Sequence, residues 1–164
     1  MSRPRLVLLN GMPGSGKSTL ARRYLAEHPG VLCVEDAELR GWIGGDPAHH
    51  AEAARHLGLA LACAHLEAGY DVVVPQLVSR LELVAGWEDV AREAGAELVE
   101  VVLHGAVVES RVPDDAVEHL VEHAHGLADV VAARPHVHRL VTRHGDVDSA
   151  YRDLLDVLDP DVPA

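Results

Sequence analysis

The segment Gly11–Ser18 reads GMPGSGKS, and it constrains the fold more than any other part of the sequence. It follows an apolar run, LVLLN at 6–10, and precedes a helical pattern over 17–28. Three glycines within 11–16 disfavour both helix and strand, and they favour a loop with unusual backbone angles. The chain is therefore expected to contain a strand, a glycine-rich loop and a helix in direct succession.

The rest of the chain continues this alternation of strand and helix. Short runs rich in Val and Leu, typical of strands buried on both faces, occur at 6–10, 31–35, 71–76, 96–103 and 136–142. Helical patterns occur at 17–28, 47–68, 81–94, 114–133 and 148–158. This order predicts one domain over 1–164 with a three-layer α/β/α fold and a mainly parallel five-stranded sheet.

Composition narrows the class of ligand. The 164-residue chain has a net charge of −12, which repels nucleic-acid phosphate and anionic lipid over most of the surface. The apolar run near the N-terminus is too short for a signal peptide or a membrane span, and Cys33 and Cys63 lack the pairing pattern of a secreted scaffold. We therefore expect a cytoplasmic protein that binds a small molecule, with no nucleic-acid partner and no membrane association.

The glycine-rich segment matches the phosphate-binding (Walker A) pattern GxxxxGK[ST] at every fixed position, in the context that the pattern requires. The N–H groups of such a loop and the N-terminus of the next helix surround a phosphate. Lys17 is the only lysine in the chain. It is expected to bind the β- and γ-phosphates as a compact charge, because an arginine fork is too wide for the loop. A glycine-rich turn without a ligand explains neither this lysine nor the hydroxyl after it.

The pattern also predicts how the neighbouring residues bind nucleotide. Ser18 supplies a hydroxyl to Mg2+, and Thr19 lies near the α-phosphate. The predicted nucleotide-binding residues are Gly11, Pro13, Gly14, Ser15, Gly16, Lys17, Ser18 and Thr19.

An acidic residue near the phosphates is expected at the end of a strand. The run at 31–35 continues into Glu35 and Asp36, whereas the runs at 71–76 and 96–103 end without an acid. In an open α/β sheet the carboxyl end of such a strand lies on the rim where ligands bind. Asp36 is therefore a candidate for the active site.

These motifs resemble those of the small P-loop kinases that phosphorylate hydroxyls of metabolites and antibiotics. The group includes gluconate kinase, shikimate kinase, adenylylsulfate kinase and chloramphenicol phosphotransferase, with the zeta-toxin sugar-nucleotide kinases as relatives. The resemblance covers the element order of nearly the whole chain and the motifs of its first 40 residues. It implies a phosphotransferase that uses ATP and Mg2+ and transfers the γ-phosphate to a hydroxyl of a small molecule.

In that group the second strand ends in an Asp, and an Arg follows about one turn later. By resemblance these are Asp36 and Arg40 in EDAELR. Asp36 orients the acceptor hydroxyl, accepts its proton and contacts Mg2+ through water, while Arg40 binds a substrate anion or the transferring phosphate. The spacing is one residue longer than the commonest pattern of the group, so Glu35 and Glu38 are alternatives to Asp36. A helix cap and a surface ion pair form the competing interpretation of Asp36 and Arg40.

A lid-like segment is expected over about 105–135, where related kinases carry paired arginines that close over ATP. Only Arg111 and Arg134 occur there, among several acids. Arg111 is our choice for the arginine that stabilises charge on the transferred phosphate, because it lies just beyond the fourth strand. An acidic lid closes poorly over a triphosphate by charge alone. An ATP-binding regulatory protein with weak or no kinase turnover is therefore the alternative function.

The acceptor site is less clearly marked. The segment after the second strand, which closes over the substrate in the resembled group, carries Trp42, His49, His50 and Arg55. Gln76 and Arg80 follow the third strand on the same rim. For Trp42 the cover of a core edge is an equal interpretation, and for Arg80 a solvated position at a helix start.

One further motif points to different chemistry. The run HLVEH at 119–123 matches an inverted zinc-protease pattern. The 41 residues that follow offer no obvious third ligand on a helix, so an exposed helix face is the favoured interpretation. A zinc hydrolase and a nucleic-acid end kinase are rival hypotheses, and the acidic surface opposes the second.

Overall fold

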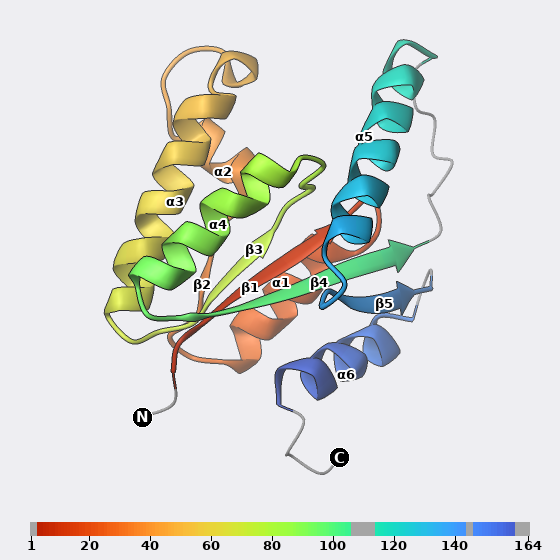
Figure 1. Ribbon diagram of the computed structural model, residues 1–164. Helices are drawn as coiled ribbons and strands as arrows, with labels where there is room; N and C mark the ends of the chain where they lie inside the picture. Colours follow the sequence, from red (N-terminus) through yellow and green to blue (C-terminus); the bar gives the residue numbers. More distant parts are fainter. Residues whose placement is uncertain (1–2, 106–113, 144–145, 160–164) are drawn as a thin grey trace.

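The structure is a computed structural model that describes residues 3–105, 114–143 and 146–159. Strands and helices alternate along these ranges (Figure 1). The strands are β1 (Arg5–Gly11), β2 (Leu32–Cys33), β3 (Val72–Pro75), β4 (Glu97–Gly105) and β5 (His138–Thr142). The helices are α1 (Lys17–Glu27), α2 (Asp36–Gly41), the 3-10 helix η1 (Pro47–His49), α3 (Ala51–Glu67), α4 (Leu81–Glu93), α5 (Asp114–Ala133) and α6 (Val147–Leu158).

The five strands form one parallel sheet in the order β2-β3-β1-β4-β5, which confirms the predicted fold class. Strand β1 lies in the centre and pairs with β3 and β4. The chain leaves β1 towards β2 and leaves β3 towards β4, so the connections of these two neighbouring strands run in opposite directions. In open parallel sheets, ligands bind at the carboxyl ends of strands at such a switch point.

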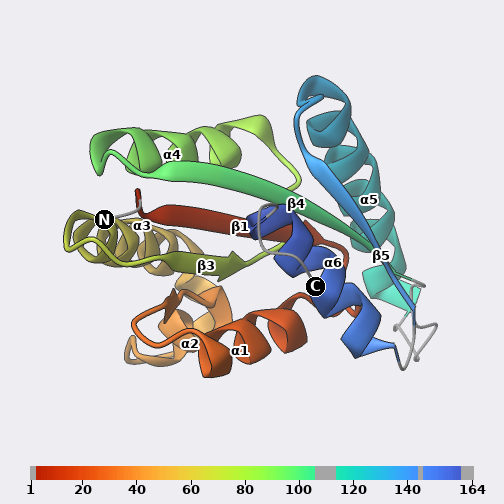
Figure 2. The same ribbon diagram turned by 90° about the horizontal axis from the view of Figure 1, so that it is seen from below.

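Helices cover both faces of the sheet (Figure 2). Alternate residues of β1 point to opposite faces, as a strand requires. Val7 and Leu9 pack in the core under α1 and α6, whereas Leu6 and Leu8 pack in the core under α2, α3 and α4. All four side chains are at most 1% exposed. The strand that precedes the glycine-rich loop is therefore buried on both faces, as the sequence predicted.

The outer parts of the sheet differ from the sequence prediction. The strand expected over 31–35 is limited to β2, and the strand expected over 136–142 is limited to β5. Neither is buried along its length. Both lie at sheet edges, where a strand has one neighbour only, and Val and Leu there are partly open to solvent.

The helices show two further differences. The helix expected over 47–68 is divided at His50, because Asp46 accepts a hydrogen bond from the N–H of Ala48 and begins the separate helix η1. The short helix α2 was not among the helical patterns, but the competing interpretation of Asp36 and Arg40 placed them at the start of a short helix, and α2 is that helix. Within the described ranges, none of the helices combines the length and the apolar character needed to cross a bilayer.

The segment expected to act as a lid contains α5. The C-terminal half of this helix is anchored, because Leu127 and Val131 pack against Val102 of β4. The action of residues 105–135 as a lid stays a prediction.

Candidate functional site

The loop between β1 and α1 has a backbone that glycine adopts most easily. Gly14 and Gly16 have φ angles of 81° and 95°, in the left-handed region. Gly16 is also the N-cap of α1, and the first turn of α1 contains no acidic residue. The unpaired N–H groups and the positive end of the helix dipole therefore meet no carboxylate from their own helix, which suits the binding of an anion.

The loop packs closely against the ends of β4 and β5. A Cβ on Gly11 would lie 2.7 Å from Ser15 Oγ and 2.8 Å from the carbonyl oxygen of Leu103, so only glycine fits there. Thr142 Oγ1 donates a hydrogen bond of 2.8 Å to the carbonyl oxygen of Ser15. The Ser15 hydroxyl itself is buried and has no hydrogen-bond partner within the described part of the chain. Thr142 thus fixes the centre of the loop, a role that the sequence analysis missed.

Lys17 is a partly buried cation that has no carboxylate partner among the described side chains. Its Nζ donates to the carbonyl oxygen of Met12 at 2.9 Å, and among the described residues it forms no ion pair. Desolvation by burial lowers the pKa of Lys17 to about 8. An uncompensated ammonium, an orphaned hydroxyl at Ser15 and a loop shaped by glycines fit the phosphate chain of a nucleotide. Ser18 and Thr19 follow Lys17 in the first turn of α1.

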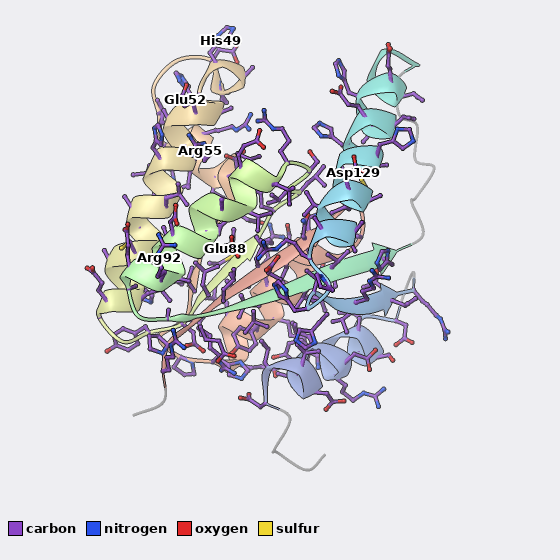
Figure 3. The ribbon with its side chains drawn as sticks, in the orientation of Figure 1. His49, Glu52, Arg55, Glu88, Arg92 and Asp129 are labelled. Carbon is purple, nitrogen blue, oxygen red and sulfur yellow. The ribbon has the colours of Figure 1, made fainter. Side chains whose placement is uncertain are left out.

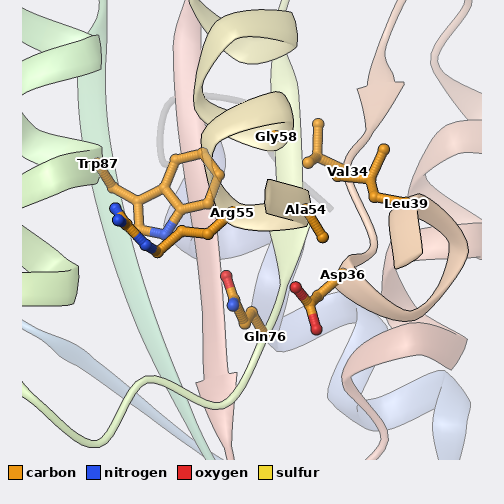
Figure 4. A pocket seen from close by; sticks show the side chains of 8 residues that line it. All are labelled: Val34, Asp36, Leu39, Ala54, Arg55, Gly58, Gln76 and Trp87. Carbon is orange, nitrogen blue, oxygen red and sulfur yellow. The ribbon is translucent and has the colours of Figure 1, made fainter. Parts of the chain in front are cut away.

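A cleft of about 610 Å³ opens close to this loop. Leu77, which lines the cleft, packs in the same apolar cluster as Met12 of the loop. Several polar side chains from α2, α3, the β3–α4 connection and α5 line it, among them Asp36, Arg40, Arg55, Gln76, Arg80 and His123. A smaller hollow contains Asp36, Arg55 and Gln76 again and is closed by the apolar side chains of Val34, Leu39 and Trp87 (Figure 4).

Asn10 connects the loop to the cleft. Its buried side chain accepts hydrogen bonds from the N–H groups of Gly11 and Val78, both at 2.8 Å, and donates one to the carbonyl oxygen of Val78 at 2.8 Å. These hydrogen bonds hold the connection that follows β3 against the carboxyl end of β1. The sequence analysis missed Asn10, although an asparagine that ends a strand of Leu and Val is a usable signal.

The three candidate acids occupy different environments. Asp36 lines the cleft, whereas Glu35 and Glu38 do not. Glu35 lies 3.5 Å from Arg22 of α1, and Glu38 is exposed. Arg40 Nε lies 2.6 Å from Asp36 Oδ2, one turn away on α2. The ion pair of the competing interpretation is therefore present, and it lies within the cleft.

Some of the remaining candidate residues line the cleft and others lie outside it. Gln76 and Arg80 line the cleft, but Trp42 is 67% exposed and does not. Arg111 lies outside the described residues. His123 lines the cleft, and its Nδ1 lies 3.0 Å from Ser79 Oγ. His119 is exposed, and its Nδ1 lies 4.0 Å from Glu122 Oε2. Within the described ranges, no group of three or more His, Cys, Asp or Glu side chains is arranged to hold a metal ion.

A parallel sheet in this order, with a GxxxxGK[ST] loop at its switch point, defines a P-loop protein with a kinase-like α/β fold. The sequence profile of the AAA domain family matches residues 6–126, and the chain belongs to this family. No curated protein matches the chain significantly.

Two solved structures, one of them a kinase, are similar to the chain over nearly its whole length. The Mycobacterium tuberculosis APS kinase CysC, solved in complex with AMPPNP and APS, is 20% identical, with a TM-score of 0.62 over 97% of this chain and 99% of that chain. The Deinococcus radiodurans tunicamycin resistance protein is 18% identical, with a TM-score of 0.63 over 96% of each chain. These likenesses confirm the fold that the sequence predicted.

A third likeness covers only part of the other protein. A chain of the Pnkp1/Rnl/Hen1 complex is 26% identical, with a TM-score of 0.56 over 74% of this chain and 39% of that chain. This chain therefore corresponds to less than half of that protein.

Proposed function

We propose that the protein is a phosphotransferase that uses ATP and Mg2+ and transfers the γ-phosphate to a hydroxyl of a small molecule. The observation that carries this proposal is the ammonium of Lys17, which has no ion-pair partner among the described residues. It is held in a loop that matches GxxxxGK[ST], close to a cleft that a carboxylate lines. A nucleotide site and an acceptor site are needed side by side for direct transfer.

The loop residues hold the nucleotide. Bound Mg-ATP supplies the phosphoryl group and neutralises part of its own charge. The N–H groups of the loop and of the N-terminus of α1 bind the β-phosphate, and Lys17 exchanges its bond to Met12 for oxygens of the β- and γ-phosphates. Ser18 is the proposed ligand of Mg2+, and Thr19 binds near the α-phosphate.

The cleft residues hold the acceptor. Asp36 orients the hydroxyl and accepts its proton, and it would help to hold Mg2+ through a water molecule. Arg40, 2.6 Å from Asp36, fixes that carboxylate and presents its other N–H groups to an anionic oxygen. Arg111, outside the described residues, is proposed to stabilise charge on the transferred phosphate.

Mass spectrometry of acceptors incubated with protein and Mg-ATP tests this proposal. The panel contains sugars, sugar acids, nucleosides, sugar nucleotides and antibiotics, and phosphorylated product is expected for at least one. Lys17→Met is expected to abolish nucleotide binding. Asp36→Asn is expected to keep nucleotide binding and to lower transfer about 100-fold or more, since it removes the general base. Asp156→Asn, at an exposed position of α6, is the matched control.

Two results would change the assignment. If Asp36→Asn kept full turnover, Glu35 or Glu38 would take the role of base. If ATP bound tightly and no acceptor gave ADP, the protein would be an ATP-binding regulator. One observation favours an ATP-binding regulator. Helix α5 carries exposed acids that would repel a triphosphate and oppose closure over it, namely Glu118, Glu122 and Asp129 (Asp129 is labelled in Figure 3). RNA ends join the panel because this chain is similar to a chain of Pnkp1/Rnl/Hen1, which is an RNA repair complex.

A further inference from the structure

Three guanidinium groups from three different elements meet in the cleft. Arg40 comes from α2, Arg55 from α3, and Arg80 from the N-cap of α4. Three carboxylates, those of Asp36, Glu52 and Glu82, line the same cleft. Arginines and acids are thus equal in number there, whereas the whole chain has a net charge of −12. The three arginines differ in whether a carboxylate lies nearby, and in this respect Arg55 differs from Arg40 and Arg80.

Two of the three arginines have a carboxylate nearby. Arg40 lies 2.6 Å from Asp36, and Arg80 lies 3.8 Å from Glu82. Arg55 has none within 4.0 Å among the described side chains. Its only hydrogen bond within the described chain goes from Nη2 to Nε2 of His56, at 3.0 Å, so most of its N–H groups stay free.

The partly buried position of Arg55 favours the binding of an anion by its guanidinium. The side chain is half-buried and lies beside Trp87, Gln76 and Asp36 in the smaller hollow (Figure 4). Trp87 is 4% exposed, so a buried aromatic side chain forms one wall of that hollow. Glu52, one turn before Arg55 on α3 (Figure 3), is exposed and does not pair with it. A guanidinium that is partly withdrawn from water binds an anion more strongly than an exposed one, and its planar fork suits a carboxylate, sulfate or phosphate.

We propose that Arg55 binds an anionic group of the acceptor, so that the acceptor is an acidic hydroxylated molecule. This inference rests on the proposed function. Asp36 and Arg55 line the same hollow and the same cleft, so one small molecule reaches the carboxylate with its hydroxyl and Arg55 with its acidic group. Arg55 is then a specificity residue, because a neutral analogue leaves its guanidinium without a partner.

The first test measures anion binding without any turnover. In the background Trp42→Phe, Lys17→Met, the only tryptophan is Trp87 in the hollow, and the lysine of the glycine-rich loop is removed. Sulfate, phosphate and acetate are titrated separately, with Trp87 fluorescence and calorimetry as readouts. We expect saturable binding of at least one of these anions, weakened about tenfold or more by Arg55→Gln, as for loss of a charge-assisted hydrogen bond. The matched control Arg152→Gln, on α6, should leave it unchanged.

The second test compares acceptors in pairs that differ only in an acidic group, such as a sugar acid and its sugar, or a nucleoside monophosphate and its nucleoside. The acidic member should be preferred, and Arg55→Gln should raise KM for it about tenfold or more with a smaller effect on kcat. A preferred neutral acceptor that is insensitive to Arg55→Gln would overturn the proposal, as would sulfate, phosphate and acetate all binding equally to both variants. If the proposed function fails, ATP does not bind or turn over, yet the anion titration still decides the role of Arg55.

Discussion

Nucleotide binding should depend on pH through Lys17. Burial lowers the pKa of Lys17 to about 8 in the free protein. The protonated fraction then falls from about nine-tenths at pH 7 to about one-tenth at pH 9. Bound phosphates favour the charged ammonium and raise its pKa well above this range. Binding must therefore take up protons, about half a proton per nucleotide at pH 8, and Kd should rise about tenfold between pH 7 and pH 9.

Isothermal titration calorimetry with Mg-AMPPNP measures both quantities. Kd is determined at pH 7 and pH 9, and proton uptake is determined at pH 8 from the heats in two buffers with different ionisation enthalpies. The pH titration of free Mg-AMPPNP, followed by phosphorus NMR, is the control, because it gives the part of the pH dependence that belongs to the nucleotide itself. Equal affinity of the unchanged protein at both pH values, with no proton uptake, would refute the claim that a lysine with a depressed pKa contacts the phosphates.

Three further predictions concern stability, each measured by chemical denaturation. Lys17→Met should raise the free energy of unfolding at pH 7 by roughly 1 kcal/mol after allowance for solvent screening, because the depressed pKa of Lys17 means that the folded state disfavours its ammonium charge. This gain should vanish above pH 10.5, where the lysine is neutral in both the folded and the unfolded state. A loss of stability at pH 7 would contradict this prediction. Gly11→Ala should cost about 2–3 kcal/mol, since its Cβ would lie 2.7 Å from Ser15 Oγ, and a change below 0.5 kcal/mol would show that the loop relaxes easily. Arg134→Met should cost about 2–3 kcal/mol, because it leaves the buried carboxylate of Glu100 with His136, 2.9 Å away, as its remaining partner among the described side chains. Arg92→Met, which breaks an exposed pair, should cost about 0–1 kcal/mol, and similar costs for the two variants would contradict this account.

The sequence predicted the elements that are long or central. The runs at 71–76 and 96–103 and the helical pattern over 81–94 have the composition and periodicity of buried elements, and each appears in the structure. The short helix α2 spans Asp36–Gly41, fewer than two turns, so it shows no period. The lengths of β2 and β5 depend on which strands lie at the sheet edges, and local composition does not contain that information.

The candidate site also has a part that the sequence predicted and a part that it did not. The glycine-rich loop was predicted because its residues are contiguous and each has a chemical reason. The cleft is assembled from α2, α3, the β3–α4 connection and α5, so its members become neighbours only when the chain folds. Asn10 and Val78, 68 positions apart, illustrate this, and so does His123, which the sequence placed in a zinc motif and the structure places beside Ser79.

The transfer of the γ-phosphoryl group is the central claim, and phosphorus NMR tests it most directly. Mg-ATP is incubated with the protein and the preferred acceptor, and the γ-phosphate signal is followed with time. The account predicts that this signal is converted into a phosphate ester of the acceptor, and that Asp36→Asn suppresses the conversion while Mg-AMPPNP still binds. Conversion of ATP to ADP and inorganic phosphate alone, at the same rate with and without the acceptor, would contradict it.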